Sequence, residues 1–180
     1  MKAILFSIAF CIFCGVLMNS ALLAAETPKA GDKAPLVEAE NQDGKAWKLA
    51  DAVGKQIVLL YFYPKDDTPG CTLEAQDFTA RVAEFEAAGT TVIGVSKDSV
   101  KAHDKFCKKH GLRIVLASDE SGTTCEDYGV WTEKSMYGKT YMGVERSTFL
   151  IDGTGKIAQV WPKVSVKGHA DEVLAAAKAL

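Results

Sequence analysis

The sequence predicts an α/β fold, in which helices flank a mixed central sheet and a hairpin lies near the N-terminus. Two continuous apolar runs, 57–63 (IVLLYFY) and 91–96 (TVIGVS), are rich in β-branched and aromatic residues. Such runs are typical of strands that are buried on both faces. Stretches whose apolar residues recur at helical spacing separate the strands. We therefore expect the first strands to be parallel and joined by helices, and the last two strands to form an antiparallel pair.

The first hairpin is expected around an Asn-Gln-Asp-Gly turn. Residues 37–39 and 46–49 flank 41–44 (NQDG), where polar residues and a glycine favour a reversal of the chain. The buried strand 57–63 follows this hairpin and ends in front of a polar loop.

One long helix is predicted after the polar loop, over 72–88. Its apolar side chains recur at helical spacing, at Ala75, Phe78, Val82 and Phe85. Gly89 marks the end of this helix, because glycine commonly follows a helix C-terminus. The second buried strand, 91–96, begins shortly afterwards.

The next segment continues the alternation of helices and strands. A charged helix is predicted over 99–110, with Gly111 ending it. A third strand is expected at 113–117 and a short helix at 122–128.

The last segment is predicted to form a hairpin and a helix. Residues 146–151 and 156–161 flank the turn 152–155 (DGTG). In the C-terminal helix, one face carries apolar residues, which are Ala170, Val173, Leu174 and Ala177.

Length and charge limit the classes of protein to consider. The 180 residues suffice for one domain with a well-buried core. A formal net charge of −2 gives no electrostatic case for a nucleic-acid or anionic-membrane partner. His103, Cys107 and His110 share a helix face but lack a fourth nearby ligand, so we expect no metal site and no cofactor.

The first 25 residues are predicted to be a secretory signal. Lys2 supplies a positive charge, 3–18 is almost wholly apolar, and small residues lead up to Ala25. We therefore expect cleavage near Ala25 and export to the periplasm. The alternative is an uncleaved segment that anchors the protein in the membrane.

Removal of the signal would leave a short linker, 26–33, and one domain, 34–180, with no further membrane association. Cys11 and Cys14 form a C-x-x-C string, but it lies inside the apolar signal, where cysteine acts as a small hydrophobe. The mature chain would then keep three cysteines, Cys71, Cys107 and Cys125.

The stretch that carries chemistry is 61–74, where a buried strand gives way to a helix. Thr68 is a good N-cap, and Pro69 suits the first helical position. Cys71 then lies in the first turn, where unpaired backbone N–H groups point outward. The helix dipole favours an anion there, so we expect the thiolate form of Cys71 to be stabilised.

These residues resemble a known family. The spacing Pro64-x-x-x-Thr68-x-x-Cys71 is similar to the active-site motif of peroxiredoxins, and the resemblance spans roughly 30–180. The segment 64–72 (PKDDTPGCT) resembles the bacterioferritin comigratory protein, or peroxiredoxin Q, subfamily. Three further segments are similar to that subfamily, namely 118–120 (SDE), 128–130 (YGV) and 146–152 (RSTFLID).

The resemblance implies a thioredoxin-like fold, a monomer and a thiol peroxidase. Cys71 would be the peroxidatic cysteine, whose thiolate attacks the O–O bond and becomes a sulfenic acid. Thr68 would hydrogen-bond the peroxide and the thiolate, and Pro64 would shield the site from water. Arg146 would place a positive charge beside the thiolate and polarise the peroxide. Glu74 is expected to support an arginine or to cap the helix.

The cysteine that resolves the sulfenic acid is less directly indicated. Many subfamily members carry it five residues after the peroxidatic cysteine, where this chain has Gln76. A second subgroup resembles the layout here, with Cys107 on the later helix, and neighbouring lysines give Cys107 an electropositive setting. Cys125 has acidic neighbours, and we interpret it as structural. We expect the first turn around Cys71 to unwind locally so that a Cys71–Cys107 disulfide can form.

The resemblance also implies peroxides as substrates and thioredoxin, or a thioredoxin-like protein, as reductant. Two other functions on the same fold stay open. A thiol-disulfide oxidoreductase would need a C-x-x-C motif at the helix start, which Pro69-Gly70-Cys71 does not provide. A redox sensor would use Cys71 only to signal, and the sequence does not distinguish it from a peroxidase.

Overall fold

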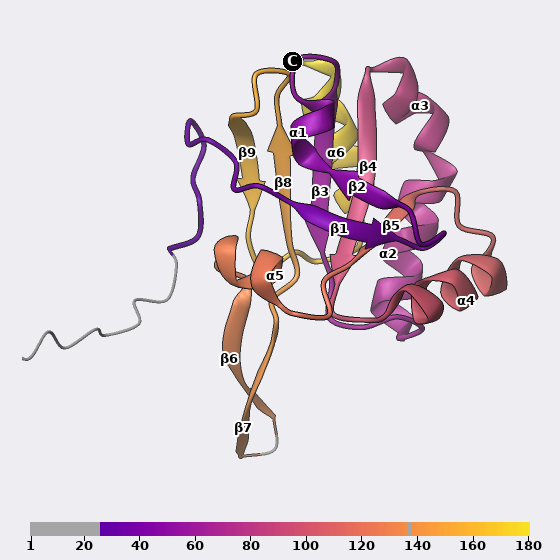
Figure 1. Cartoon of the computed structure of the whole chain (residues 1–180), viewed down its shortest axis with the longest axis vertical. Helices are drawn as coiled ribbons and strands as arrows, with labels where there is room; N and C mark the ends of the chain where they lie inside the picture. Colours follow the sequence, from indigo (N-terminus) through magenta and orange to yellow (C-terminus); the bar gives the residue numbers. More distant parts are fainter. Residues whose placement is uncertain (1–25, 137) are drawn as a thin grey trace, which may run out of the picture.

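The centre of the molecule is a seven-stranded mixed sheet (Figure 1). The computed structural model describes residues 26–136 and 138–180, so the predicted signal 1–25 lies outside the described residues. The strand order is β2-β1-β5-β4-β3-β8-β9. Its strands are β1 (Glu38–Asn41), β2 (Ala46–Lys48), β3 (Ile57–Phe62), β4 (Thr90–Ser96), β5 (Val115–Ser118), β8 (Ser147–Ile151) and β9 (Ile157–Trp161).

The direction of the strands agrees with the predicted order of connections. β3, β4 and β5 are parallel neighbours, whereas β8 runs antiparallel to β3, and β9 runs antiparallel to β8. The N-terminal hairpin β1–β2 pairs antiparallel with β5 and completes the other edge. This is the thioredoxin-like arrangement that the sequence analysis expected.

Helices cover both faces of the sheet. They are α1 (Leu49–Ala52), α2 (Pro69–Ala80), α3 (Val82–Ala87), α4 (Val100–His110), α5 (Thr123–Asp127) and α6 (His169–Lys178). None of the helices in the described part of the chain is long and apolar enough to cross a membrane.

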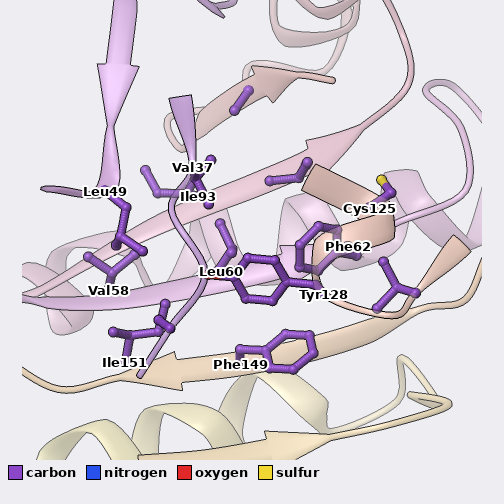
Figure 2. Close-up of a cluster of buried hydrophobic side chains, with 14 of the residues drawn as sticks. Val37, Leu49, Val58, Leu60, Phe62, Ile93, Cys125, Tyr128, Phe149 and Ile151 are labelled. Atoms are coloured by element: carbon purple, nitrogen blue, oxygen red, sulfur yellow. The ribbon is translucent and has the colours of Figure 1, made fainter. Parts of the chain in front are cut away.

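Two buried clusters hold these layers together, because side chains of β3 alternate between its faces. Leu60 and Phe62 point into a cluster with Tyr128 and Phe149, beneath α1 and α5 (Figure 2). Leu59, Tyr61 and Tyr63 point into the other cluster, beneath α2, α3, α4 and α6. The second cluster includes Cys71, so the packing of the core helps to fix the position of this thiol.

The prediction of one helix over 72–88 was wrong, because the chain forms two helices that are separated at Arg81. Arg81 has φ −104° and ψ 5°, and its guanidinium reaches across to pair with Asp171 of α6. Phe78 and Phe85 are both buried on either side of the break. Because the apolar spacing persists through the break, periodicity alone did not reveal it.

A further hairpin was missed, and one strand was displaced. β6 (Trp131–Met136) and β7 (Lys139–Val144) form a separate antiparallel pair that projects from the body in Figure 1. Most of its residues are exposed or half-buried, so they lack the alternation that marks a half-buried strand. The strand expected at 113–117 runs from Val115 to Ser118 instead, and Arg113 bonds the Thr79 carbonyl.

Candidate active site

Cys71 lies in the first turn of α2, at the end of the loop that follows β3. The helix begins at Pro69, and Thr68 occupies the N-cap position with an extended backbone. Cys71 is the third helical residue, so its backbone N–H is among those without a partner inside the helix. Its side chain is buried, with only 2% of the residue exposed.

Arg146 brings a positive charge to the Cys71 sulfur from a distant part of the chain. Phe62 pairs with Ser147 in the sheet, which places Arg146 next to the loop that leads into α2. The Nη2 group of Arg146 donates to Cys71 Sγ at 3.1 Å. The structure thus unites the two residues that the motif singled out, although 75 positions separate them.

Glu74 completes a buried charged group with these two residues. Its Oε2 accepts from Arg146 Nη1, whereas its Oε1 has no hydrogen-bond partner among the described residues. Burial raises the pKa of Glu74 to about 7, against the opposing effect of Arg146. Burial disfavours the charged guanidinium, but Glu74 and Cys71 outweigh burial and raise the pKa of Arg146. The sequence signal for Glu74 was its position three residues after Cys71, on the same side of the helix.

Thr68 and Pro64 lie on the loop beside Cys71. The Thr68 hydroxyl donates to the Lys65 carbonyl at 3.0 Å and makes no hydrogen bond to the start of α2, so the predicted side-chain cap does not form. Pro64 is exposed and lines a cavity of about 480 Å³. Residues of the β6–β7 hairpin, including Trp131 and Tyr141, also line this cavity.

Cys107 lies on α4 as a half-buried free thiol. The prediction of an electropositive setting was wrong. Burial, followed by the nearby Asp66 carboxylate, raises the pKa of Cys107 to about 12. The adjacent lysines are engaged elsewhere, since Lys108 pairs with Asp104 and Lys109 with Asp67.

Cys125 is wholly buried in the cluster beneath α5, near Phe62 and Tyr128 (Figure 2). Burial, and then the Asp119 carboxylate, raises the pKa of this thiol. Asp119 also accepts from the Cys125 backbone N–H at 2.8 Å. This environment agrees with the interpretation of Cys125 as a packing residue.

His103 and His110 do not converge on a common point beside Cys107. Instead, His103 bonds Asp66 and His110 bonds Asp67, so both rings bind the loop before α2. Sequence reasoning missed this connection, because the aspartates and the histidines belong to segments about 40 residues apart.

Comparisons with known proteins agree with this geometry. The profile described as the AhpC/TSA family matches residues 30–160. The chain is 54% identical to peroxiredoxin Bcp of Xanthomonas campestris over 122 residues, which cover 68% of this chain and 76% of the relative. It is 48% identical to peroxiredoxin Bcp of Bacillus subtilis over 148 residues, or 82% of this chain and 94% of the relative.

A solved structure is similar over nearly the whole described chain. It is the bacterioferritin comigratory protein of X. campestris, studied for alkyl peroxide reduction through trapped intermediate and ligand complexes. The TM-score is 0.77 at 44% identity, and the match covers 86% of this chain and 98% of that one.

Proposed function

The chain belongs to the AhpC/TSA family as a peroxiredoxin of the Bcp type, a thiol peroxidase, and from this premise we propose that Cys71 is its peroxidatic cysteine. The Cys71 thiolate attacks the terminal oxygen of a hydroperoxide, so that an S–O bond forms and the O–O bond breaks. Sulfur loses two electrons and becomes a sulfenic acid. The leaving alkoxide or hydroxide takes a proton and departs as alcohol or water.

The contact between Arg146 Nη2 and Cys71 Sγ, at 3.1 Å, is the observation that carries this proposal. A guanidinium at this distance donates a charge-assisted hydrogen bond to a thiolate. It also lies where negative charge develops on the peroxide oxygens during the attack. Because Glu74 holds the other Nη group, Arg146 is oriented before substrate arrives.

Thr68 and Pro64 are assigned supporting roles. We assign the Thr68 hydroxyl, which donates to the Lys65 carbonyl in this structure, a second state in which it turns toward the peroxide. Pro64 lines the cavity of about 480 Å³, and we assign its ring the role of limiting the entry of water to Cys71. Trp131, Tyr141 and Met142 give this cavity an apolar part beside its charged residues, and that part suits organic hydroperoxides as well as hydrogen peroxide. The X. campestris relative, described as reducing alkyl peroxides, supports this substrate class.

Cys107 is proposed as the resolving cysteine. Its thiol attacks the sulfenic sulfur of Cys71, an S–S bond forms, the S–O bond breaks, and water leaves with the thiol proton. With a pKa near 12, Cys107 is protonated and half-buried in the folded form. Resolution therefore needs local opening of the first turn of α2, which would expose Cys107 to water and ease its ionisation.

We also propose the reductant, the cellular location and the oligomeric state of the protein. Thioredoxin, or a thioredoxin-like protein of the cell envelope, would reduce the disulfide and return both thiols. The mature protein would act as an exported monomer after cleavage near Ala25. N-terminal sequencing of the protein isolated from its source, together with light scattering, tests cleavage and monomer state.

A peroxide-turnover assay tests the central proposal. Wild-type protein should consume hydrogen peroxide and an alkyl hydroperoxide continuously with a thioredoxin system present, and Cys71→Ser should consume neither. Cys107→Ser should react once and then accumulate sulfenic or sulfinic acid, whereas Cys125→Ser should turn over like wild type. A wild type that is oxidised once but never turns over with any dithiol would favour the sensor function.

A further inference from the structure

Polar contacts tie the loop before α2 to α4, on the helix face that carries Cys107. The five residues that make them are here called the α4 clasp, and they are Asp66, Asp67, His103, Lys109 and His110. His103 and His110 lie one turn to either side of Cys107 along the helix. The clasp therefore joins the segment of the peroxidatic cysteine to the segment of the proposed resolving cysteine.

The inner half of the clasp is buried and has several partners. Asp66 accepts from His103 Nδ1 at 2.8 Å and from the Tyr63 hydroxyl at 2.7 Å. The backbone N–H of Asp66 also donates to Asp98 at 2.9 Å. His103 is fully buried and Asp66 is only 9% exposed, so this half forms part of the folded core.

The outer half of the clasp lies at the surface. Asp67 accepts from Lys109 Nζ at 2.6 Å and from His110 Nε2 at 2.7 Å. These hydrogen bonds lower the pKa of Asp67, so its carboxylate stays charged. Asp67 also has φ +61°, a left-handed conformation that aspartate tolerates better than most residues. The loop therefore reverses direction at Asp67, whose carboxylate is bound by Lys109 and His110 of α4.

We propose that the α4 clasp stays closed while the first turn of α2 unwinds, and that it positions the Cys71 sulfenic acid for attack by Cys107. The inference rests on the proposed function, since it needs Cys107 to resolve Cys71. Asp67 lies four residues before Cys71, so an unwound segment reaches about 14 Å from the clasp. His110 lies three residues after Cys107 on an intact helix. The two sulfurs can therefore meet without any displacement of α4.

The gain in rate follows from the length of the loop that must close. Tyr63, which follows β3, stays buried in the core and lies eight residues before Cys71. With the clasp closed, the free segment is only the four residues from Asp67 to Cys71. If loop closure scales as the 3/2 power of length, halving the free segment favours disulfide formation by up to about threefold.

The test weakens the clasp from the loop side and from the helix side. It follows oxidation of Cys71 and formation of the Cys71–Cys107 disulfide separately. Asp67→Asn weakens the outer half of the clasp from the loop and keeps a residue that tolerates positive φ, and the double variant Lys109→Gln/His110→Gln opens the same outer half from the helix. Rapid quenching, thiol alkylation and intact-mass spectrometry resolve thiol, sulfenic, sulfinic and disulfide forms over time. We expect unchanged oxidation of Cys71, disulfide formation slowed by up to about threefold, and a sulfinic fraction per turnover raised by the same factor.

A matched control comes from the same helix. Lys108→Gln removes the exposed pair between Lys108 Nζ and Asp104, at 2.7 Å, which does not reach the loop. This variant should form the disulfide at the wild-type rate. Combining Asp67→Asn with the helix-side double variant should slow resolution little more than the helix-side variant alone, because both open the same contacts.

The outcomes distinguish a failure of the clasp proposal from a failure of the proposed function. Wild-type or faster disulfide formation in the helix-side variant would overturn the positioning role of the clasp while leaving the peroxidase intact. A wild type that forms no Cys71–Cys107 disulfide would instead overturn Cys107 as the resolving residue, and the clasp proposal with it. Slowed oxidation of Cys71 itself in the clasp variants would also contradict the proposal, since it would place the clasp in the peroxide step.

Discussion

Glu74 and Arg146 form a buried ion pair in contact with the Cys71 sulfur, because one guanidinium nitrogen of Arg146 bonds the carboxylate and the other bonds the thiol. Glu74 has 2% of its side chain exposed and Arg146 15%. A buried pair of this kind is costly to break, because removal of one partner leaves the other charge unpaired. A substitution of either residue should therefore change the stability of the protein, because it leaves the other charge of the pair without its partner.

The stability of the protein should depend on pH through Glu74. Its pKa is about 7 in the folded chain and near 4.5 when unfolded, so between these values the folded state holds more protons. The Glu74 contribution is then fully present below pH 4.5 and is lost as pH rises through 7, by about 3 kcal/mol. Urea unfolding of wild type and Glu74→Gln across pH 4.5–8 measures this difference. A difference in unfolding free energy that does not change with pH would contradict the buried, protonatable carboxyl.

Arg146→Lys should lower the rate of peroxide reduction more than it lowers stability. Lysine keeps a positive charge near Glu74 but cannot serve the carboxylate and the sulfur together with one planar fork. We expect kcat/KM for hydrogen peroxide to fall by about 10²-fold or more, as when one donor to a developing charge is lost. Arg113→Lys is the control, because the Arg113 guanidinium bonds the Thr79 carbonyl near the C-terminal end of α2 and, among the described residues, makes no hydrogen bond to Cys71 or Glu74. Equal losses in both variants would argue against a specific role for Arg146.

Local patterns in the sequence predicted the features that depend on local interactions. The apolar run at β3 and the glycine at 111 predicted their elements, because burial on both faces and a left-handed C-cap leave direct sequence signals. The Cys71–Arg146 contact was reached only through the family motif, since the sheet register that joins them cannot be read from either segment. The setting of Cys107 was misjudged because its lysine neighbours are local, whereas the Asp66 carboxylate arrives from another loop.

Thr68→Val should separate catalysis from helix capping. The hydroxyl bonds Lys65 rather than an amide of α2, so valine removes no cap and should cost about 1 kcal/mol or less of stability. If this hydroxyl also contacts the peroxide, kcat/KM should fall by about 10-fold or more, and Thr68→Ser should restore most of it. Stopped-flow oxidation of Cys71, read alongside the urea midpoint, checks both expectations. A valine variant with wild-type kcat/KM would remove Thr68 from the chemistry.

His169 should give stability the opposite dependence on pH. Its Nε2 lies 2.8 Å from the Thr148 hydroxyl, and its ring packs against the edges of Phe78 and Trp161. Burial lowers the pKa of His169 to about 4, from 6.5 when unfolded, so the unfolded state holds more protons between these values. The His169 contribution is present above pH 6.5 and is lost as pH falls through 4, by about 3 kcal/mol.

Glu74 and His169 should therefore mask one another between pH 4.5 and 6.5, where their contributions to stability change in opposite directions. His169→Gln should reveal the Glu74 slope, with unfolding free energy falling as pH rises, and Glu74→Gln should reveal the His169 slope. The double variant should lose both slopes, and its residual dependence serves as the baseline for the other groups. Urea unfolding at half-unit pH intervals checks this, and parallel curves for the two single variants would contradict the opposed assignments.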